Sequence, residues 1–142
     1  MAAGLIVLGS ETIHSGAALL VVDGDTVHSG EERIRLLGLD APEIHHAQCE
    51  AERRLAVLAK RRLEQLLQSG TAEFQPDHGA GRDKYGRLLA HLLVNGEDVA
   101  CILINEGYAR AWTGHREDWC HKLDLAKQAD AKADCGTTSS TD

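Results

Sequence analysis

Long apolar runs are missing from this chain of 142 residues. None approaches the roughly 18 residues of a membrane-spanning helix, so we expect no association with a membrane. The run from Leu5 to Leu8 is short and no Lys or Arg precedes it, which makes it a poor signal peptide. No internal repeat is present, and the length suits a single domain with a core of its own.

Positive charge is in deficit as well. The 22 Asp and Glu residues outnumber the 15 Lys and Arg residues and leave a net charge of −7. A protein that coats nucleic acid through general electrostatics carries the opposite sign, so a passive DNA-binding module is disfavoured. The argument is weaker against an enzyme, because an enzyme needs positive charge only where a phosphate binds.

Cysteine pairs of the C-x-x-C type are absent, so neither a zinc ribbon nor a thioredoxin-type site is predicted. His45 and His46 with Cys49 are an alternative metal site, but adjacent histidines in a loop are usually solvated and we do not favour it. A disulfide is left open, because it depends on the compartment of the protein. No pairing is predicted among the four cysteines, which are Cys49, Cys101, Cys120 and Cys135.

Hydrophobic patterns divide the chain into short elements. The run RIRLLGL at 33–39 alternates apolar and basic residues, which is typical of a strand. Leucines recur every three to four residues over 47–69, which indicates a helix that Gly70 ends. We expect strands at 17–22, 26–28, 33–39, 71–75 and 88–94, an extended piece at 109–112, and helices at 47–69, 98–106 and 115–133.

This order of elements predicts an α+β protein with an OB-fold. The arrangement is a five-stranded barrel with one helix between strands 3 and 4 and two C-terminal helices. We place the OB-fold domain at residues 17–133, between an N-terminal extension of unknown role at 1–16 and a disordered Thr/Ser tail at 134–142. The apolar run at 5–8 has three alternative roles: an added strand, a remnant of a signal or an interaction edge.

Two acidic segments each follow an apolar strand, DGDT at 23–26 and DAPE at 40–43. Each segment alone is typical of a solvated turn. Because the two strands are neighbours in the predicted sheet, we expect Asp25, Asp40 and Glu43 to lie in one small region. Carboxylates about 4 Å apart repel by roughly 4 kcal/mol at an effective dielectric of 20, so such a cluster needs a cation or a proton. Oxygen ligands favour calcium or magnesium.

Two arginines accompany these carboxylates in the sequence. Arg35 is on the third predicted strand, on the face opposite to Ile34 and Leu36, and Arg87 directly precedes the strand at 88–94. Either arginine alone is more typical of solvated surface charge. A guanidinium binds two phosphate oxygens through parallel hydrogen bonds, so two arginines beside a cation site suit a phosphodiester.

Four blocks of the sequence resemble the staphylococcal nuclease (thermonuclease) family. They are DGDT at 23–26, IRLLGLDAPE at 34–43, DKYGRLLA at 83–90 and LINEGYAR at 103–110. They occur in the order of the family with family-like spacing, and the resemblance spans roughly 17–112. Any one block would be weak, whereas chance agreement of all four is very rare.

The resemblance implies one bound calcium ion and a role for each matching residue. Arg35 and Arg87 would bind the scissile phosphate and stabilise its transition state, and Glu43 would act as the general base on the attacking water. Lys84 and Tyr85 would contact a neighbouring phosphate. The metal ligands would be the side chains of Asp25 and Asp40 and the backbone carbonyl of Ala41, with Asp23 supporting them.

The expected function is therefore calcium-dependent hydrolysis of DNA and RNA by a monomer, with single strands preferred. The resemblance slightly favours a secreted or periplasmic location. The alternatives are an idle OB-fold module that binds nucleic acid or protein, and a structural or scavenging protein in which cleavage is incidental. The chain departs from the family after the last block, where a nucleotide-holding tyrosine is replaced. Trp112 stands near this place and could stack on a base or pack in the core.

Overall fold

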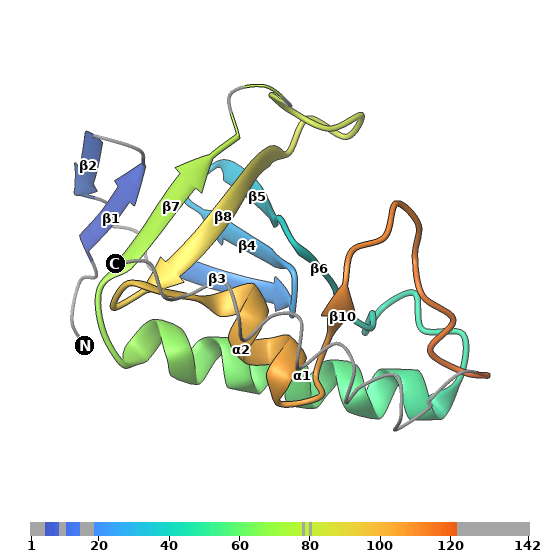
Figure 1. Ribbon diagram of the computed structural model, residues 1–142. Coiled ribbons are helices and arrows are strands. Elements are labelled where there is room, and N and C mark those ends of the chain that lie inside the picture. The colour runs from blue at the N-terminus through green and yellow to red at the C-terminus, as the bar shows by residue number, and fades with distance from the viewer. Residues whose placement is uncertain (1–4, 9–10, 15–18, 78, 80, 122–142) are drawn as a thin grey trace.

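The structure is a computed structural model that describes residues 5–8, 11–14, 19–77, 79 and 81–121. In this part of the chain, two helices lie together against one main sheet, and two short strands form a second sheet (Figure 1). The elements in chain order are β1 (Leu5–Leu8), β2 (Glu11–His14), β3 (Leu19–Asp23), β4 (Thr26–Ser29), β5 (Glu32–Leu36), β6 (Leu39–Asp40), α1 (Glu50–Gln68), β7 (Ala72–Pro76), β8 (Leu88–Val94), β9 (Glu97–Asp98), α2 (Val99–Asn105) and β10 (Arg110–Ala111).

The main sheet has the strand order β2-β1-β7-β8-β5-β4-β3, and β9 pairs with β8 beside this path. Strands β3, β4 and β5, which correspond to the first three predicted strands, form an antiparallel meander. Strand β8 then pairs parallel to β5 and antiparallel to β7. The long helix α1 connects β6 to β7, which is its predicted place between the third and fourth strands of the OB-fold.

The predicted barrel does not close among the described residues, where β2 and β3 form the two ends of the sheet. Strand β1 pairs parallel with β7, so that Ile6 is opposite Ala72 and Leu8 is opposite Phe74. A strand has only two hydrogen-bonding edges, and β7 uses its other edge for β8. No edge of β7 is then left for β3. Of the three alternative roles of the run at 5–8, the structure supports the added strand.

The core lies between α1 and the sheet. One face of α1 is buried at a spacing of three to four residues, through Ala56, Ala59, Leu63 and Leu66. Phe74 of β7 is fully buried in the same region. Each buried Leu or Phe side chain stabilises the fold by about 1.5–3 kcal/mol relative to an exposed one. No helix in the described ranges is long and apolar enough to cross a membrane.

The start of α1 is fixed by a disulfide that the sequence left open. Cys49 and Cys120 are joined, with 6.0 Å between their Cα atoms. Cys49 is also the N-cap of α1, and its Sγ accepts a hydrogen bond from the N–H of Glu52 at 3.4 Å. The disulfide removes Cys49 from the alternative metal site with His45 and His46, whose side chains are exposed.

The last helix, predicted at 115–133, is wrong in its first part, because residues 115–121 form neither helix nor strand. The Asp118 carboxylate accepts hydrogen bonds at 3.0 Å from the backbone N–H groups two and three residues further on. This side-chain turn competes with helical hydrogen bonding. Trp119 is buried and holds the turn against the interior. The rest of the predicted helix and the tail predicted at 134–142 lie outside the described residues.

Candidate active site

Four segments meet at one end of the sheet: the turn between β3 and β4, strand β5, strand β6 with the loop after it, and the loop before β8. Thr26 of β4 lies opposite Arg35 of β5. The Thr26 hydroxyl accepts a hydrogen bond from Arg87 Nη1 at 3.5 Å and donates one to Asp25 Oδ1 at 3.0 Å. The ladder of strands therefore brings Arg35 and Arg87 beside Asp25, although Arg87 is 61 residues away from Thr26 in the sequence.

The turn at 23–26 is held against α1 by close packing at Gly24. A Cβ at this position would lie 3.0 Å from Cβ of Ala59 in α1 and 3.1 Å from Cβ of Ala41. Any larger residue would push the turn away from the helix, since contacts this short are rarely tolerated. Gly24 thus allows the two aspartates beside it to lie next to the loop that carries Ala41.

Arg35 and Asp25 form an ion pair at the centre of the site. Arg35 Nη1 lies 3.4 Å from Asp25 Oδ2, and the two side chains are 15% and 12% exposed. The guanidinium also donates to the backbone carbonyls of Leu36 at 2.6 Å and Leu39 at 3.2 Å. These contacts fix the arginine against the bend between β5 and β6, where Gly38 has a φ of 93°. The outward strand arginine is consequently not an ordinary solvated charge.

Asp40 is almost completely buried, at 2% exposure. Its Oδ2 accepts hydrogen bonds from the backbone N–H of Glu117 at 2.9 Å and from Trp119 Nε1 at 3.1 Å. Burial raises the pKa of Asp40 above its ordinary value, these hydrogen bonds partly offset the rise, and the nearby charge of Asp25 adds to it. Two carboxylates therefore share a poorly solvated region, as the sequence predicts.

The oxygen atoms near Asp25 and Asp40 fit a hard cation in their chemistry. The N–H of Ala41 donates to Asp25 Oδ2 at 3.3 Å, which brings the backbone at Ala41 beside the first carboxylate. Asp40 Oδ1 accepts no hydrogen bond within the described ranges. No group of three or more His, Cys, Asp or Glu side chains in the described part of the chain is arranged as a metal site. Any cation here would thus need oxygen ligands besides carboxylates.

Glu43 lies on the loop after β6, with its side chain 27% exposed. Its carboxylate forms an ion pair with Arg116 at 2.8 Å. Burial raises its pKa, the Arg116 charge opposes the rise, and the charges of Asp23 and Asp25 add to it. Asp23 has a raised pKa as well, chiefly through burial, although the N–H of Ile44 donates to it at 3.2 Å. Glu43 is thus electrostatically part of the carboxylate cluster.

Arg87 is held by the loop that precedes β8. Its Nε lies 2.7 Å from Asp83 Oδ2, and its backbone N–H donates to Asp83 Oδ1 at 2.9 Å. Lys84 and Tyr85 lie between these two residues and are exposed. Both cations lie over the Tyr85 ring, with Lys84 Nζ at 5.2 Å and Arg87 Cζ at 5.5 Å from its centroid. The loop thus presents an aromatic ring and two positive charges beside Thr26.

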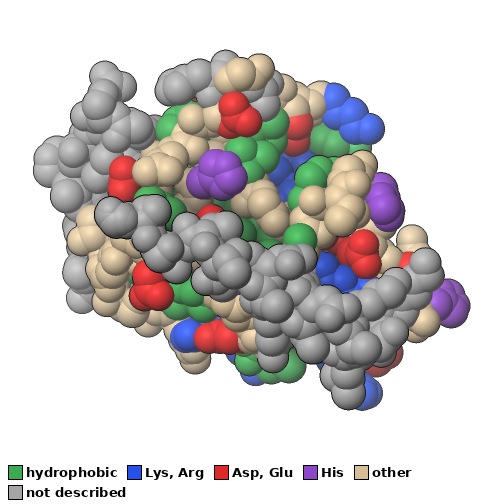
Figure 2. All heavy atoms as spheres, viewed as in Figure 1, with side chains coloured by type: hydrophobic (Ala, Val, Ile, Leu, Met, Phe, Trp, Pro, Cys, Tyr) green, Lys and Arg blue, Asp and Glu red, His purple; other side chains and the backbone are tan. Residues whose placement is uncertain are grey.

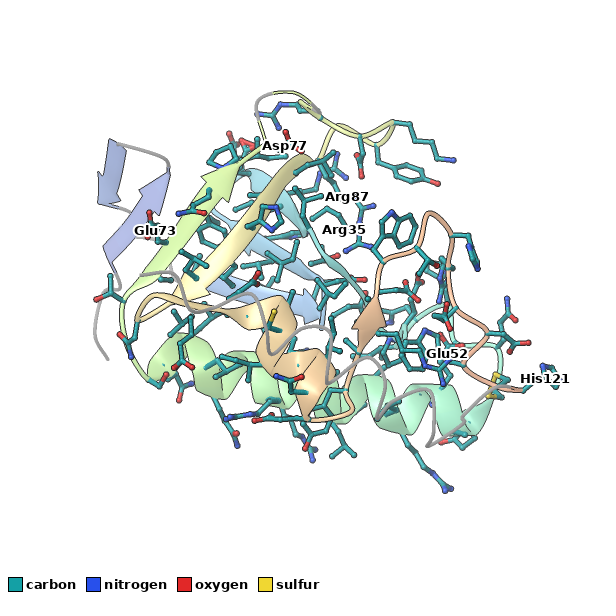
Figure 3. All side chains as sticks on the ribbon, in the orientation of Figure 1. Arg35, Glu52, Glu73, Asp77, Arg87 and His121 are labelled. Carbon is teal, nitrogen blue, oxygen red and sulfur yellow. A yellow bond between two sulfur atoms is a disulfide. The ribbon has the colours of Figure 1, made fainter. Side chains whose placement is uncertain are left out.

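Trp112 follows β10 and is 45% exposed. Arg35 Cζ lies 5.7 Å from the centroid of its ring. Of its two alternatives, packing in the core is wrong. Figure 3 labels Arg35 and Arg87, the two arginines of the site, and Glu52 near the start of α1. Each arginine of the site thus lies beside one exposed aromatic ring, Arg35 beside Trp112 and Arg87 beside Tyr85.

Four residues near the site were not found by sequence reasoning: Glu52, Arg116, Glu117 and Trp119. Glu52 is 2% exposed, and its carboxylate accepts hydrogen bonds from the N–H groups of Glu43 at 3.0 Å and Gln48 at 2.9 Å. In the sequence, Glu52 is one of many charged residues in the predicted helix at 47–69, so nothing distinguishes it. The other three lay in the segment predicted as a helix at 115–133. Only Trp119 within it and Gly114 just before it could have argued for a packed turn.

Comparisons with known proteins identify the family of the chain. A model of the family described as "Staphylococcal nuclease homologue" matches residues 33–135, so Asp23 and Asp25 lie just before the matched range. The chain is 46% identical over 52 residues to endonuclease YncB and to the SPbeta prophage-derived endonuclease YokF, both of Bacillus subtilis (strain 168). These matches cover 37% of this chain, 25% of YncB and 18% of YokF. Because the family match spans well over half of the sequence, the chain belongs to the family of staphylococcal nuclease homologues.

Proposed function

We propose that the protein is a calcium-dependent nuclease that hydrolyses phosphodiester bonds of DNA and RNA. The observation that carries the proposal is the connection of both arginines to Asp25, directly from Arg35 at 3.4 Å and through Thr26 from Arg87. Two guanidinium groups beside buried carboxylates suit an anionic substrate that binds with a cation. The family and its two endonuclease relatives support this reading.

In the proposed mechanism, Arg35 and Arg87 bind the phosphate that is cut. Each fork can donate two hydrogen bonds to phosphoryl oxygens, and these bonds strengthen as negative charge develops on them. Arg35 has to leave Asp25 to do so, or to share its donors with the phosphate. Arg87 is oriented by Asp83, which leaves its Nη atoms on the side of Thr26.

The calcium ion would be held by Asp25, Asp40 and the carbonyl of Ala41, with Asp23 nearby. The buried, mutually repelling carboxylates support this assignment, because a cation removes the repulsion between Asp25 and Asp40. When bound, the ion would supply positive charge beside the phosphoryl oxygens. Calcium takes about six to eight oxygen ligands, and those that the protein does not supply can come from water or from the substrate.

Glu43 would remove the proton from the attacking water. Its raised pKa makes the carboxylate a better base than an ordinary glutamate, and it faces the cluster from the loop after β6. Lys84 and Tyr85 would contact a neighbouring phosphate, since both are exposed next to Arg87. An open, shallow site suits single strands, whose bases can reach exposed rings such as Tyr85 and Trp112.

Electrostatic attraction at a distance has little part in this proposal. On the described part of the face in Figure 2, acidic and basic side chains are scattered and form no broad basic patch. With a net charge of −7, the protein should bind nucleic acid weakly away from the site. We expect a monomer that acts through local contacts and needs the cation for productive binding.

The test is cleavage of plasmid and single-stranded DNA and of RNA, with calcium, with magnesium and with chelator. The proposal expects calcium-dependent cleavage, faster on single strands. Cleavage that persists in chelator would remove the cation from the mechanism. Binding without cleavage under all conditions would favour the idle OB-fold module.

A further inference from the structure

The segment 116–120, which we name the strap, touches two carboxylates of the proposed site, Asp40 and Glu43, and lies outside the four sequence blocks. The N–H of Glu117 and Nε1 of Trp119 donate to Asp40 at 2.9 and 3.1 Å. Arg116 Nη1 lies 2.8 Å from a carboxylate oxygen of Glu43. Asp40 and Glu43 thus depend on the strap for a large share of their hydrogen bonds.

The strap is held in place by side chains and by a covalent bond. It contains neither helix nor strand, so no backbone ladder fixes it. The Arg110 guanidinium lies 4.7 Å from the Trp119 ring centroid and pairs with Glu117 at 2.8 Å. At its end, Cys120 is bonded to Cys49, the residue that caps α1. Opening this disulfide would leave the strap tied by noncovalent contacts only.

Arg116 bridges two acidic groups whose positions define the loop after β6. Its Nη1 contacts Glu43, and its Nη2 lies 3.1 Å from Oε2 of Glu52, which is buried. Glu52 also accepts the backbone N–H of Glu43 at 3.0 Å. The backbone of Glu43 is thus fixed by Glu52, and its side chain is fixed by Arg116. Without Arg116, the carboxylate would be free to take other rotamers toward solvent.

We propose that Arg116 is a positioning residue for Glu43 and that the Cys49–Cys120 disulfide keeps the strap, and with it Arg116, in place. This inference rests on the proposed function, because it assigns Arg116 to the nuclease mechanism through Glu43. The planar fork can contact both carboxylates at once, which a lysine ammonium does less well. The contact is therefore specific in geometry as well as in charge.

The first experiment compares Arg116→Gln and Arg116→Lys with the wild type. A misplaced base slows chemistry without weakening substrate binding, so kcat should fall about 10- to 100-fold in Arg116→Gln while KM stays within about twofold. Arg116→Lys should retain an intermediate kcat. The control is Arg54→Gln, which removes an equal charge from an exposed position on α1. Equal kcat in Arg116→Gln and Arg54→Gln, or a higher kcat in Arg116→Gln, would overturn the proposal.

The second experiment opens the disulfide. In a Cys101→Ser/Cys135→Ser variant, only Cys49 and Cys120 remain as cysteines. Dithiothreitol transfers two electrons and two protons to this bond, yielding two thiols and its own cyclic disulfide. We expect kcat to fall by a factor similar to that in Arg116→Gln, and to recover on reoxidation. An unchanged kcat in the reduced protein, with reduction verified by thiol titration, would refute the role of the disulfide.

Amide hydrogen exchange tests the same inference without any cleavage. The N–H groups of Glu43 and Glu117 should exchange faster in the reduced protein, because the strap and the loop loosen, while amides of β8 stay protected. Unchanged exchange at both sites would overturn the proposal that the disulfide keeps the strap in place. A wild type that cuts no nucleic acid but shows this exchange pattern would refute the proposed nuclease function and leave the strap as a holder of Asp40 and Glu43.

Discussion

Glu43 is the residue whose surroundings bear most directly on the proposed chemistry. Its pKa is raised by burial and by the charges of Asp23 and Asp25, whereas Arg116 opposes this shift. With its pKa raised, the Glu43 carboxylate takes up a proton from water more readily than an ordinary glutamate does. Its loop position was predictable from the DAPE segment, but the paired arginine was not. Arg116 and its second partner Glu52 are 64 residues apart in the sequence.

Replacing Glu43 by Gln tests the base directly. The amide keeps the shape of the side chain and loses the proton acceptor, so kcat should fall at least about 10²-fold while KM changes little. Single-turnover kinetics on a short single-stranded DNA measure the chemical step. Glu50→Gln, at an exposed position in the first turn of α1, is the matched control and should keep full activity. Unchanged turnover in Glu43→Gln would exclude Glu43 as the base.

The two arginines can be tested by keeping their charge. Lysine lacks the fork that binds two phosphoryl oxygens, so Arg35→Lys and Arg87→Lys should each lose most of the cleavage activity. Arg53→Lys makes the same chemical change on the exposed face of α1 and should have no effect. The measurement is kcat/KM for all three variants. Near-normal values for both site variants would remove these arginines from the proposed mechanism.

At the scale of elements, an apolar run with clear boundaries was predictable. The alternating run at 33–39 is instead divided between β5 and β6, and segments fixed by distant contacts were not predictable. Strand β8 has the predicted bounds, because its apolar run is bounded by turn residues on both sides. The prediction of a helix from residue 115 was wrong. Hydrophobic periodicity is a local pattern, whereas Trp119 donates a hydrogen bond to Asp40, which is 79 residues away in the sequence. Among the described residues, the prediction of a closed barrel was wrong for a similar reason. The edge of β7 that β3 would need is paired with β1, and both of these strands are far from β7 in the sequence.

The loop before β8 gives a prediction for acid. Burial tends to raise the pKa of Asp83, but hydrogen bonds from Arg87 and Tyr85 outweigh it and hold the pKa below its ordinary value of 3.8. A lowered folded-state pKa means that Asp83 stabilises the fold above pH 3.8, and that this contribution is lost as pH falls further. Asp83→Asn should therefore lower stability near neutral pH and lose less stability in strong acid.

Urea unfolding of wild type and Asp83→Asn between pH 7 and pH 3 measures this difference. The control is Glu31→Gln, on the exposed turn after β4. Asp77→Asn is less suitable, because Asp77 lies in the turn next to the loop that contains Asp83. Parallel pH profiles for wild type and Asp83→Asn would show that Asp83 does not support the loop.

At the scale of the whole molecule, a bound cation should appear as added stability. Calcium that binds only the folded protein raises its free energy of unfolding by about 2.7 kcal/mol at a hundredfold excess over Kd. Few protein ligands imply modest affinity, so millimolar calcium should raise the melting temperature by a few degrees, and a nucleotide with phosphates should enlarge the shift. Thermal melts with calcium and with chelator provide the measurement.

Asp40→Asn is the companion variant. Because the folded-state pKa of Asp40 is raised, its ionised form costs stability above that pKa, and the cost disappears in acid. The variant should thus be more stable than wild type at neutral pH without calcium, with a gain that shrinks as pH falls, and it should not respond to calcium. Equal calcium shifts in both proteins would place the ion elsewhere on this acidic surface.

The Cys49–Cys120 bond also affects how the chain responds to proteases. Lys84 is exposed in the loop between β7 and β8, and trypsin cleavage after it would divide the chain within the span that the disulfide closes. The two fragments would stay linked and migrate as one band without reductant, and as two bands with it. Because β8 pairs with strands of the first fragment, the nicked protein should also keep its sheet.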